Sequence, residues 1–155
     1  MNDIAESPHN EVATQFRDSV MVLQEQLAQL PQVECPLIHR FTEGAYAREI
    51  FLPADTIIIG KIHKHGHLNF ITQGEVSVVT EFGVERYKAP YTFVSLPLTK
   101  RALYTHSDTI WTTVHVTTET DLIKLEEELI YPSYDAAELE MLTKKALEVQ
   151  EANNV

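Results

Sequence analysis

Residues 60–79 read Gly-Lys-Ile-His-Lys-His-Gly-His-Leu-Asn-Phe-Ile-Thr-Gln-Gly-Glu-Val-Ser-Val-Val. Three histidines occupy alternate positions of this stretch: His63, His65 and His67. Alternate residues share one face of an extended strand, so the three imidazoles could converge if the strand continued through them. Gly66 favours a turn between them. The stretch therefore predicts a strand, a histidine-rich turn, a second strand, a tight turn at Gly74 and a third strand.

Short segments with strand patterning continue on both sides of this stretch. They are residues 45–52, 56–60, 70–73, 75–81, 84–88, 92–96, 101–106 and 109–117. Turn signals recur about every 8–12 residues, and no helical periodicity runs through this part of the chain. Such spacing is typical of a β-barrel or a β-sandwich.

The histidine-rich stretch resembles the first motif of the cupin superfamily, which runs Gly, five residues, His-x-His, three or four residues, Glu, six residues, Gly. Anchoring on Gly74 gives the family's first His, second His and Glu positions to Lys61, His63 and His67. Anchoring on the visible His-x-His makes His63 and His65 the pair and places Asn69 near the Glu position. One ligand position is irregular in either alignment, and both alignments stay open.

The segment Pro97-Leu-Thr-Lys-Arg-Ala102 resembles the family's second motif, Pro-x-Gly-x-x-His. Ala102 stands at the His position and cannot coordinate a metal. His106, on the same strand parity, and His115, on the following strand, are the two candidates to replace it. The resemblance covers roughly residues 45–117 and implies a mainly β protein with a cupin-type antiparallel β-barrel, a jelly roll.

Neutral imidazole is a common ligand for zinc, iron and nickel. The histidine cluster therefore predicts a divalent transition-metal site with these ligands: His63, His65, His67 and His115. A solvated histidine-rich turn and a histidine contact at a subunit interface are the alternatives. Metal binding should weaken below about pH 6, because imidazoles near their usual pKa of about 6.5 protonate.

Other kinds of site find little support in the sequence. It has no Gly-x-Ser-x-Gly elbow and no Gly-rich phosphate loop, so no catalytic residue and no nucleotide cofactor are predicted. We expect the basic pair Lys100-Arg101 to be solvated. Cys35 is the only cysteine, which rules out an internal disulfide and fits a reducing compartment.

Helical patterns flank the barrel segment. Before it, apolar residues follow at alternating spacings of four and three up to Pro31: Phe16, Val20, Leu23, Leu27 and Leu30. This seam predicts a helix of roughly twenty residues that packs either on its own barrel or across subunits. After the barrel, residues 121–129 fit a short helix. Ser133 can cap a last helix with the apolar stripe Leu139, Leu142, Ala146 and Val149.

Three segments follow from these patterns: a helical arm (1–34), a cupin-like β-barrel (35–118) and an acidic C-terminal helical segment (119–155). The whole chain has 155 residues and a formal net charge of −11, which disfavours nucleic-acid binding. No apolar run approaches the roughly 20 residues of a membrane span, and the first residues do not resemble a signal peptide. A cytoplasmic location is expected, in a host cytoplasm or a virion if the chain is phage-encoded.

The chain as a whole also resembles small cupin-like proteins encoded by tailed bacteriophages, which implies a virion or accessory protein. The favoured interpretation is a non-catalytic module that works through homo-oligomeric assembly, with other virion proteins as further partners and a vestigial metal site. The alternative is a small metal-dependent enzyme of the dioxygenase or isomerase class, with the histidines at the barrel mouth. A sensor that binds a ligand at the barrel mouth is the third hypothesis.

Overall fold

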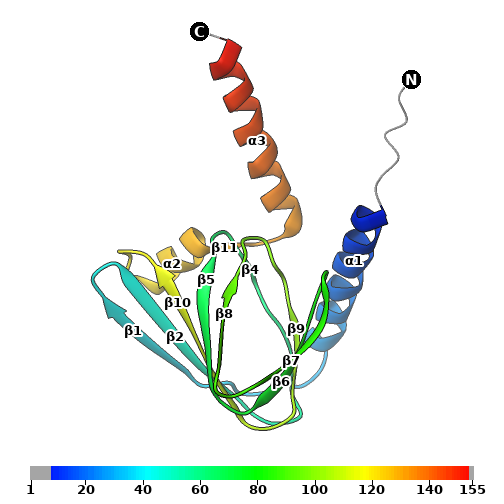
Figure 1. The fold of residues 1–155 in the computed structure, drawn as a ribbon, viewed down its shortest axis with the longest axis vertical. Coiled ribbons are helices and arrows are strands. Elements are labelled where there is room, and N and C mark those ends of the chain that lie inside the picture. Colours follow the sequence, from blue (N-terminus) through cyan, green and yellow to red (C-terminus); the bar gives the residue numbers. More distant parts are fainter. Residues whose placement is uncertain (1–7, 154–155) are drawn as a thin grey trace.

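A computed structural model describes residues 8–153 of the chain (Figure 1). Side chains at 8–13 and at 139, 142, 143, 145, 146, 149, 150 and 153 lie outside the described part. Three helices are present in these residues: α1 (Pro8–Ala28), α2 (Leu122–Leu129) and α3 (Tyr134–Asn153). The rest of the secondary structure is antiparallel β-sheet, as the cupin-type jelly roll predicted.

Two sheets form the barrel. The larger has the strand order β1 (Leu37–Thr42), β2 (Ala45–Leu52), β10 (Thr109–Val116), β5 (His67–Gln73) and β8 (Tyr91–Ser95). The smaller has the order β3 (Ile57–Ile59), β9 (Ala102–Thr105), β6 (Glu75–Thr80) and β7 (Gly83–Lys88). A separate pair joins β4 (Ile62–His63) to β11 (Ile130–Tyr131). The last pairing ties the C-terminal segment to the histidine-rich stretch.

The two sheets pack face to face through an apolar core. Its fully buried members come from both sheets: Leu52, Ile71, Val76, Val78 and Trp111. Along β5, the buried residues His67, Asn69 and Ile71 alternate with more exposed ones. This is the period of two that a strand with one buried face requires.

Gly74 makes the turn that the sequence predicted between β5 and β6. Its φ is +92°, which L-residues with a side chain rarely adopt. A Cβ atom there would lie 2.4 Å from the Asp108 carbonyl oxygen, a clash with backbone. The position therefore requires glycine for both conformation and space.

Helix α1 packs on its own chain along the predicted seam. Val20 is buried, Phe16, Leu23 and Leu27 are half-buried, and Leu30 beyond the helix is exposed. The Lys100 ammonium donates to Gln24 Oε1 at 2.6 Å, and Arg17 pairs with Glu138 at 3.2 Å. Helix α1 therefore contacts the barrel through Gln24 and the start of α3 through Arg17.

Both C-terminal helices begin at a side-chain cap, and the cap of α3 is the predicted Ser133. Asp121 accepts from the backbone N–H groups of Ile123 and Lys124 before α2. Ser133 Oγ accepts from the Ala136 N–H before α3. The predicted stripe of α3 lies outside the described side chains: Leu139, Leu142, Ala146 and Val149. Within residues 8–153, no helix combines the length and the hydropathy that a membrane span requires.

Candidate metal and ligand site

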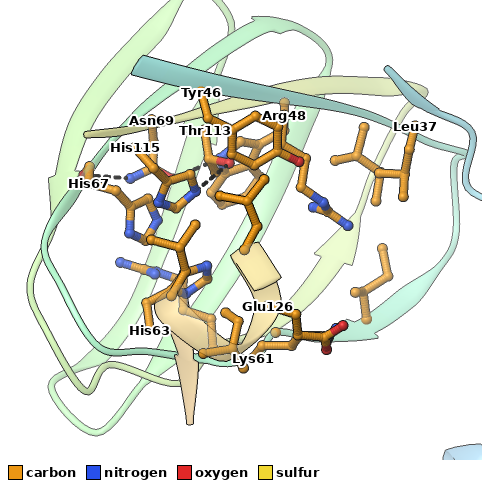
Figure 2. Close-up of a pocket in the computed structure, with 18 of the residues that line it drawn as sticks. Leu37, Tyr46, Arg48, Lys61, His63, His67, Asn69, Thr113, His115 and Glu126 are labelled. Atoms are coloured by element: carbon orange, nitrogen blue, oxygen red, sulfur yellow. Dashed lines mark hydrogen bonds and ion pairs between the residues drawn. The ribbon is translucent and has the colours of Figure 1, made fainter. Parts of the chain in front are cut away.

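The barrel encloses a cavity of about 380 Å³, lined by both sheets and by α2 (Figure 2). Helix α2 packs across the cavity through Leu125 and Leu129, which form a buried cluster with Tyr46 of β2. Most of the wall is apolar, and a few polar side chains point into it: Arg48, His63, His67, Asn69, Arg101 and His115. Apolar walls with a few convergent polar groups are characteristic of small-molecule sites.

Three imidazoles gather in this cavity from three different strands. The ring centroids of His63 and His67 are 4.3 Å apart, those of His67 and His115 are 4.7 Å apart, and those of His63 and His115 are 5.4 Å apart. His67 and His115 are 5% and 4% exposed. Figure 2 shows the three labelled rings on one side of the cavity.

Strand register explains why His67 and His115 meet. Leu68 of β5 pairs with Val114 of β10, so the inward side chains beside this pair, His67 and His115, lie next to each other. His63 arrives from the end of β4, where its backbone carbonyl accepts from the Leu98 N–H at 2.9 Å. Lys64 then donates its N–H to the Leu129 carbonyl at 2.8 Å, which holds the turn against the end of α2.

His65 does not join this cluster, although the sequence grouped it with His63 and His67. It is exposed, in the bend between β4 and β5, and does not line the cavity. The bend resets the strand alternation, so His63 and His67 converge from separate strands while His65 faces away. Lys61, His63 and His67 all line the cavity, which favours the alignment anchored on Gly74.

Of the two candidates for the missing second-motif histidine, the structure brings His115 to the cavity. His106 lies elsewhere: its Nε2 is 2.7 Å from the Ser77 hydroxyl, and its ring packs edge-on against Tyr104. His39 lies at the cavity wall and hydrogen-bonds through Nδ1 with the Tyr46 hydroxyl at 2.6 Å.

Burial keeps the three clustered imidazoles neutral at neutral pH. The pKa of His63 is lowered to about 3, chiefly by desolvation and then by the neighbouring His67 and His115. Desolvation is also the largest cause that lowers the pKa of His67 and of His115, each to about 4. Neutral imidazoles keep a nitrogen lone pair available for a metal.

Free nitrogen atoms are present in the cluster. The Nδ1 atoms of His63 and His67 are buried and have no hydrogen-bond partner among the described residues. His115 Nε2 lies 3.1 Å from the Thr113 hydroxyl. Buried polar atoms are normally satisfied, so two orphaned nitrogens in one cavity indicate a missing partner.

The residues fit a metal by type and by charge state, and their ring centroids lie within 5.4 Å of one another. The rings are stacked or tilted at 15–45° to one another, however. Among the described residues, no group of three or more His, Cys, Asp or Glu side chains already has donor atoms arranged for a metal. Coordination would therefore require the imidazole rings to reorient within the cavity.

Two arginines of the cavity were not predicted as site residues. Arg48 belongs to the inward-facing alternation of β2, together with Tyr46, Ile50 and Leu52. The expectation that Lys100-Arg101 is solvated is wrong, because Lys100 is 6% exposed and Arg101 is half-buried at the cavity wall. The parity of β2 was the one signal in the sequence that pointed to Arg48.

Asn69 supports the cavity floor. Its Nδ2 donates to Ser95 Oγ at 2.7 Å, and its Oδ1 accepts from Trp111 Nε1 at 3.0 Å. It is 1% exposed and two residues from His67 on the same face of β5. This network fixes the strand that carries His67 against β8 and β10.

No protein-family profile and no curated protein sequence matches this chain. Solved structures do match. The cupin domain of Cnp3 from Schizosaccharomyces pombe is 16% identical over 65% of this chain and 76% of that chain, with a TM-score of 0.48. A cupin superfamily protein from Desulfitobacterium hafniense is 8% identical over 59% and 84%, with a TM-score of 0.48.

A salicylate 1,2-dioxygenase from Pseudaminobacter salicylatoxidans has a TM-score of 0.52 at 11% identity. The match covers 77% of this chain and 36% of that chain, so this chain spans about a third of the dioxygenase. At this identity the likeness concerns the fold alone, and nothing in these comparisons bears on the resemblance to phage-encoded proteins. Strand order, core and structural neighbours together show that the chain has the cupin-type β-barrel fold.

Proposed function

We propose that this chain is a metal-dependent cupin-type protein that binds a small organic ligand inside its barrel. One observation carries the proposal: His63, His67 and His115 bring three neutral imidazoles together in a cavity of about 380 Å³. Ala102 stands where the second motif has a histidine, and this absence favoured a vestigial metal site. His115 supplies a third imidazole from another strand, so that loss no longer argues against binding.

His63, His67 and His115 would hold the metal, and zinc, iron and nickel all accept this donor set. Such a metal, when bound, supplies Lewis-acid polarisation of a ligand oxygen or, for iron, redox chemistry. The chain's own residues hold and enclose the ligand. Asn69 anchors the strand of His67, while Leu125 and Leu129 of α2 cover part of the cavity with apolar surface.

Calorimetric titration of zinc and nickel into chelator-treated protein tests the metal site. We expect one site per chain, with binding lost in each of three variants: His63→Ala, His67→Ala and His115→Ala. His65→Ala is the matched control, since it removes an exposed histidine from the same turn and should leave the titration unchanged. Equal binding by wild type and a triple variant of the clustered histidines would refute the proposal. Oxygen uptake by iron-loaded protein with candidate acids then tests the dioxygenase class.

A second candidate, assembly into homo-oligomers, is favoured by the outer face of the larger sheet. Leu68 pairs in register with Val94 on β8 and with Val114 on β10, and these side chains alternate with the inward ones. Leu68 and Val94 are 47% and 62% exposed, and Val116 at the end of β10 is 89% exposed. Contiguous exposed apolar surface of this kind often marks an interaction site. A virion or accessory phage protein would use such a face.

Light scattering tests the assembly candidate at tens of micromolar protein. Val94→Lys should lower the molar mass of an oligomer that uses this face, whereas Val84→Lys on β7 should not. Val84 is the matched control because it is 70% exposed on the other sheet. A chain shortened to begin at Gln32 tests the α1 seam: its oligomer should have a lower molar mass if the seam contributes to assembly. A monomeric wild-type protein would exclude assembly of the chain with itself.

A further inference from the structure

We infer that the cavity selects a small organic carboxylate, held by Arg48 and Arg101 beside the three histidines. This inference rests on the proposed function in one respect, that the ligand occupies the same cavity. It adds the chemical class of the ligand and two residues that recognise it.

The two guanidinium groups lie at the cavity with no carboxylate of the described side chains in direct contact. Burial lowers the pKa of both arginines, and the more distant charges of Glu126 on Arg48 and Glu85 on Arg101 only partly oppose this. Both arginines line the cavity and both are half-buried. Among the described residues, neither forms an ion pair with a carboxylate or donates a side-chain hydrogen bond. Arg101 instead lies over the Phe93 ring, 5.5 Å from its centroid. Burying a charge without a partner costs free energy. Two such charges in one cavity therefore indicate that an anionic ligand pairs with them.

Both arginines line the same cavity as the histidine cluster and act on it electrostatically. The charge of Arg101 lowers the pKa of both His63 and His67, and the charge of Arg48 lowers that of both His63 and His115. Figure 2 shows Arg48 directed into the cavity beside Tyr46. A ligand beside the imidazoles would lie within reach of a guanidinium.

The charges of the cavity do not balance. Glu126 is the acidic residue at its wall, and it pairs with Lys61 at 2.5 Å, so these two charges cancel. The two arginines leave a balance of +2, and a divalent metal on three neutral imidazoles would raise it to +4. Anionic ligands compensate such a site, and arginine binds carboxylates through paired hydrogen bonds.

The apolar walls decide between an inorganic anion and an organic acid. Ile50, Leu103 and Leu125 line the same cavity, and Ile58, Trp111 and Leu129 extend this surface. An inorganic anion would leave this surface without a partner. A carboxylate with an apolar body pairs with the arginines and covers the walls at the same time.

Ligand-observed NMR and calorimetry with defined probes test the inference. Benzoate and hexanoate are the carboxylates, and benzamide and hexanamide are their neutral counterparts. We expect at least about tenfold weaker binding of the amides, because they cannot pair with a guanidinium. Arg48→Met and Arg101→Met should each weaken carboxylate binding by about tenfold or more, and the corresponding Arg→Lys variants should recover part of it.

Arg86→Met is the control variant, because Arg86 is exposed on β7 and pairs with Glu75 outside the cavity. It should leave all four affinities unchanged. Amides that bind as well as the acids, arginine variants that bind benzoate like wild type, or tighter binding of phosphate than of any carboxylate would overturn the inference. Absence of binding by both carboxylates would overturn it as well.

The titrations are run on metal-free protein in chelator and on zinc-loaded protein. Carboxylate binding that depends on the arginines in metal-free protein supports this inference even if zinc does not bind. Zinc binding through the histidines without a preference for carboxylates supports the proposed function and refutes this inference.

Discussion

The same strands build two unlike regions inside the barrel. β5 contributes Ile71 to the apolar core and His67 to the cavity. β10 likewise contributes Trp111 to the core and His115 to the imidazole cluster. β2 runs from Tyr46 and Arg48 at the cavity to Leu52 in the core. Along each strand, the inward side chains change from apolar to polar towards the end of the barrel where α2 packs.

Strand alternation determines which side chains point into the barrel, but it does not determine whether they form core or cavity. The alternation places all these side chains inside the barrel. Chemistry then divides them: the core residues exclude water and fill volume, while the cavity residues keep unsatisfied nitrogens and unpaired charges. Substitutions in the core should therefore alter stability, and substitutions in the cavity should alter binding.

The largest expected effect lies in the core. Ile71 is 1% exposed, and Ile71→Ala should lower the free energy of unfolding by about 2–5 kcal/mol, since it removes buried methyl groups and leaves a cavity. Urea unfolding followed by circular dichroism measures this change. Val84→Ala on the exposed β7 should stay within about 0.5 kcal/mol of wild type. A loss below 1 kcal/mol for Ile71→Ala would mean that the core is not packed as described.

Asn69 lies where the two regions meet. Asn69→Ala leaves the Trp111 N–H without its acceptor and removes the donor to Ser95, so we expect a loss of about 1–3 kcal/mol. The same variant should weaken zinc binding, because Asn69 fixes the strand of His67. Unfolding and calorimetry on one sample measure both effects. A variant with wild-type stability and weakened zinc binding would show that Asn69 serves the site alone and does not stabilise the fold.

The histidine cluster predicts a pH-dependent stability of the metal-free protein. The pKa of His115 is about 4 when folded, against an ordinary value of about 6.5. The folded state therefore binds fewer protons between these values, and stability falls as pH drops from about 6.5 towards 4. Above pH 6.5 this contribution is fully present.

Unfolding curves at pH 7 and pH 5 measure the contribution of His115. Between pH 7 and pH 5, the free energy of unfolding should fall less in His115→Gln than in wild type. The difference between the two falls should be at most about 2 kcal/mol. His65→Gln changes an exposed histidine in the same turn as His63, and it should show the same pH dependence of stability as wild type. Equal pH dependence of wild type and His115→Gln would show that the imidazole is not buried in solution.

Much of the fold could be predicted from the sequence. The alternation of apolar residues, the turn at Gly74 and the Ser133 cap are local signals, and the structure confirms each of them. The pairing of β11 with β4 was not predictable, because two-residue strands carry no period of their own. That pairing crosses the expected boundary between the barrel and the C-terminal segment.

The candidate site was predictable only in part. Spacing predicted that His63 and His67 lie together, and their rings do so. The same strand parity also included His65, which the structure leaves exposed. Gly66 is the one strong sequence signal for the bend that turns His65 outward. The role of His115 depended on strand register, which sequence spacing does not determine. Arg101 was assigned to solvent because most arginines are exposed, and tertiary packing overrode that expectation.

The smallest expected effect concerns the ion pair between Lys61 and Glu126. The two side chains are each 60% exposed, and the pair links the residue before β4 to α2 at the cavity wall. Exposed pairs contribute less than about 1 kcal/mol, so Glu126→Gln should change the free energy of unfolding by no more than that. Removing this carboxylate also leaves the charge of Lys61 unpaired at the wall and takes away a negative charge that acts on Arg48, so benzoate binding should become tighter rather than weaker. Urea unfolding and benzoate titration of one variant separate the two effects. Weaker benzoate binding with unchanged stability would indicate that Glu126 closes α2 over the ligand instead of competing with it.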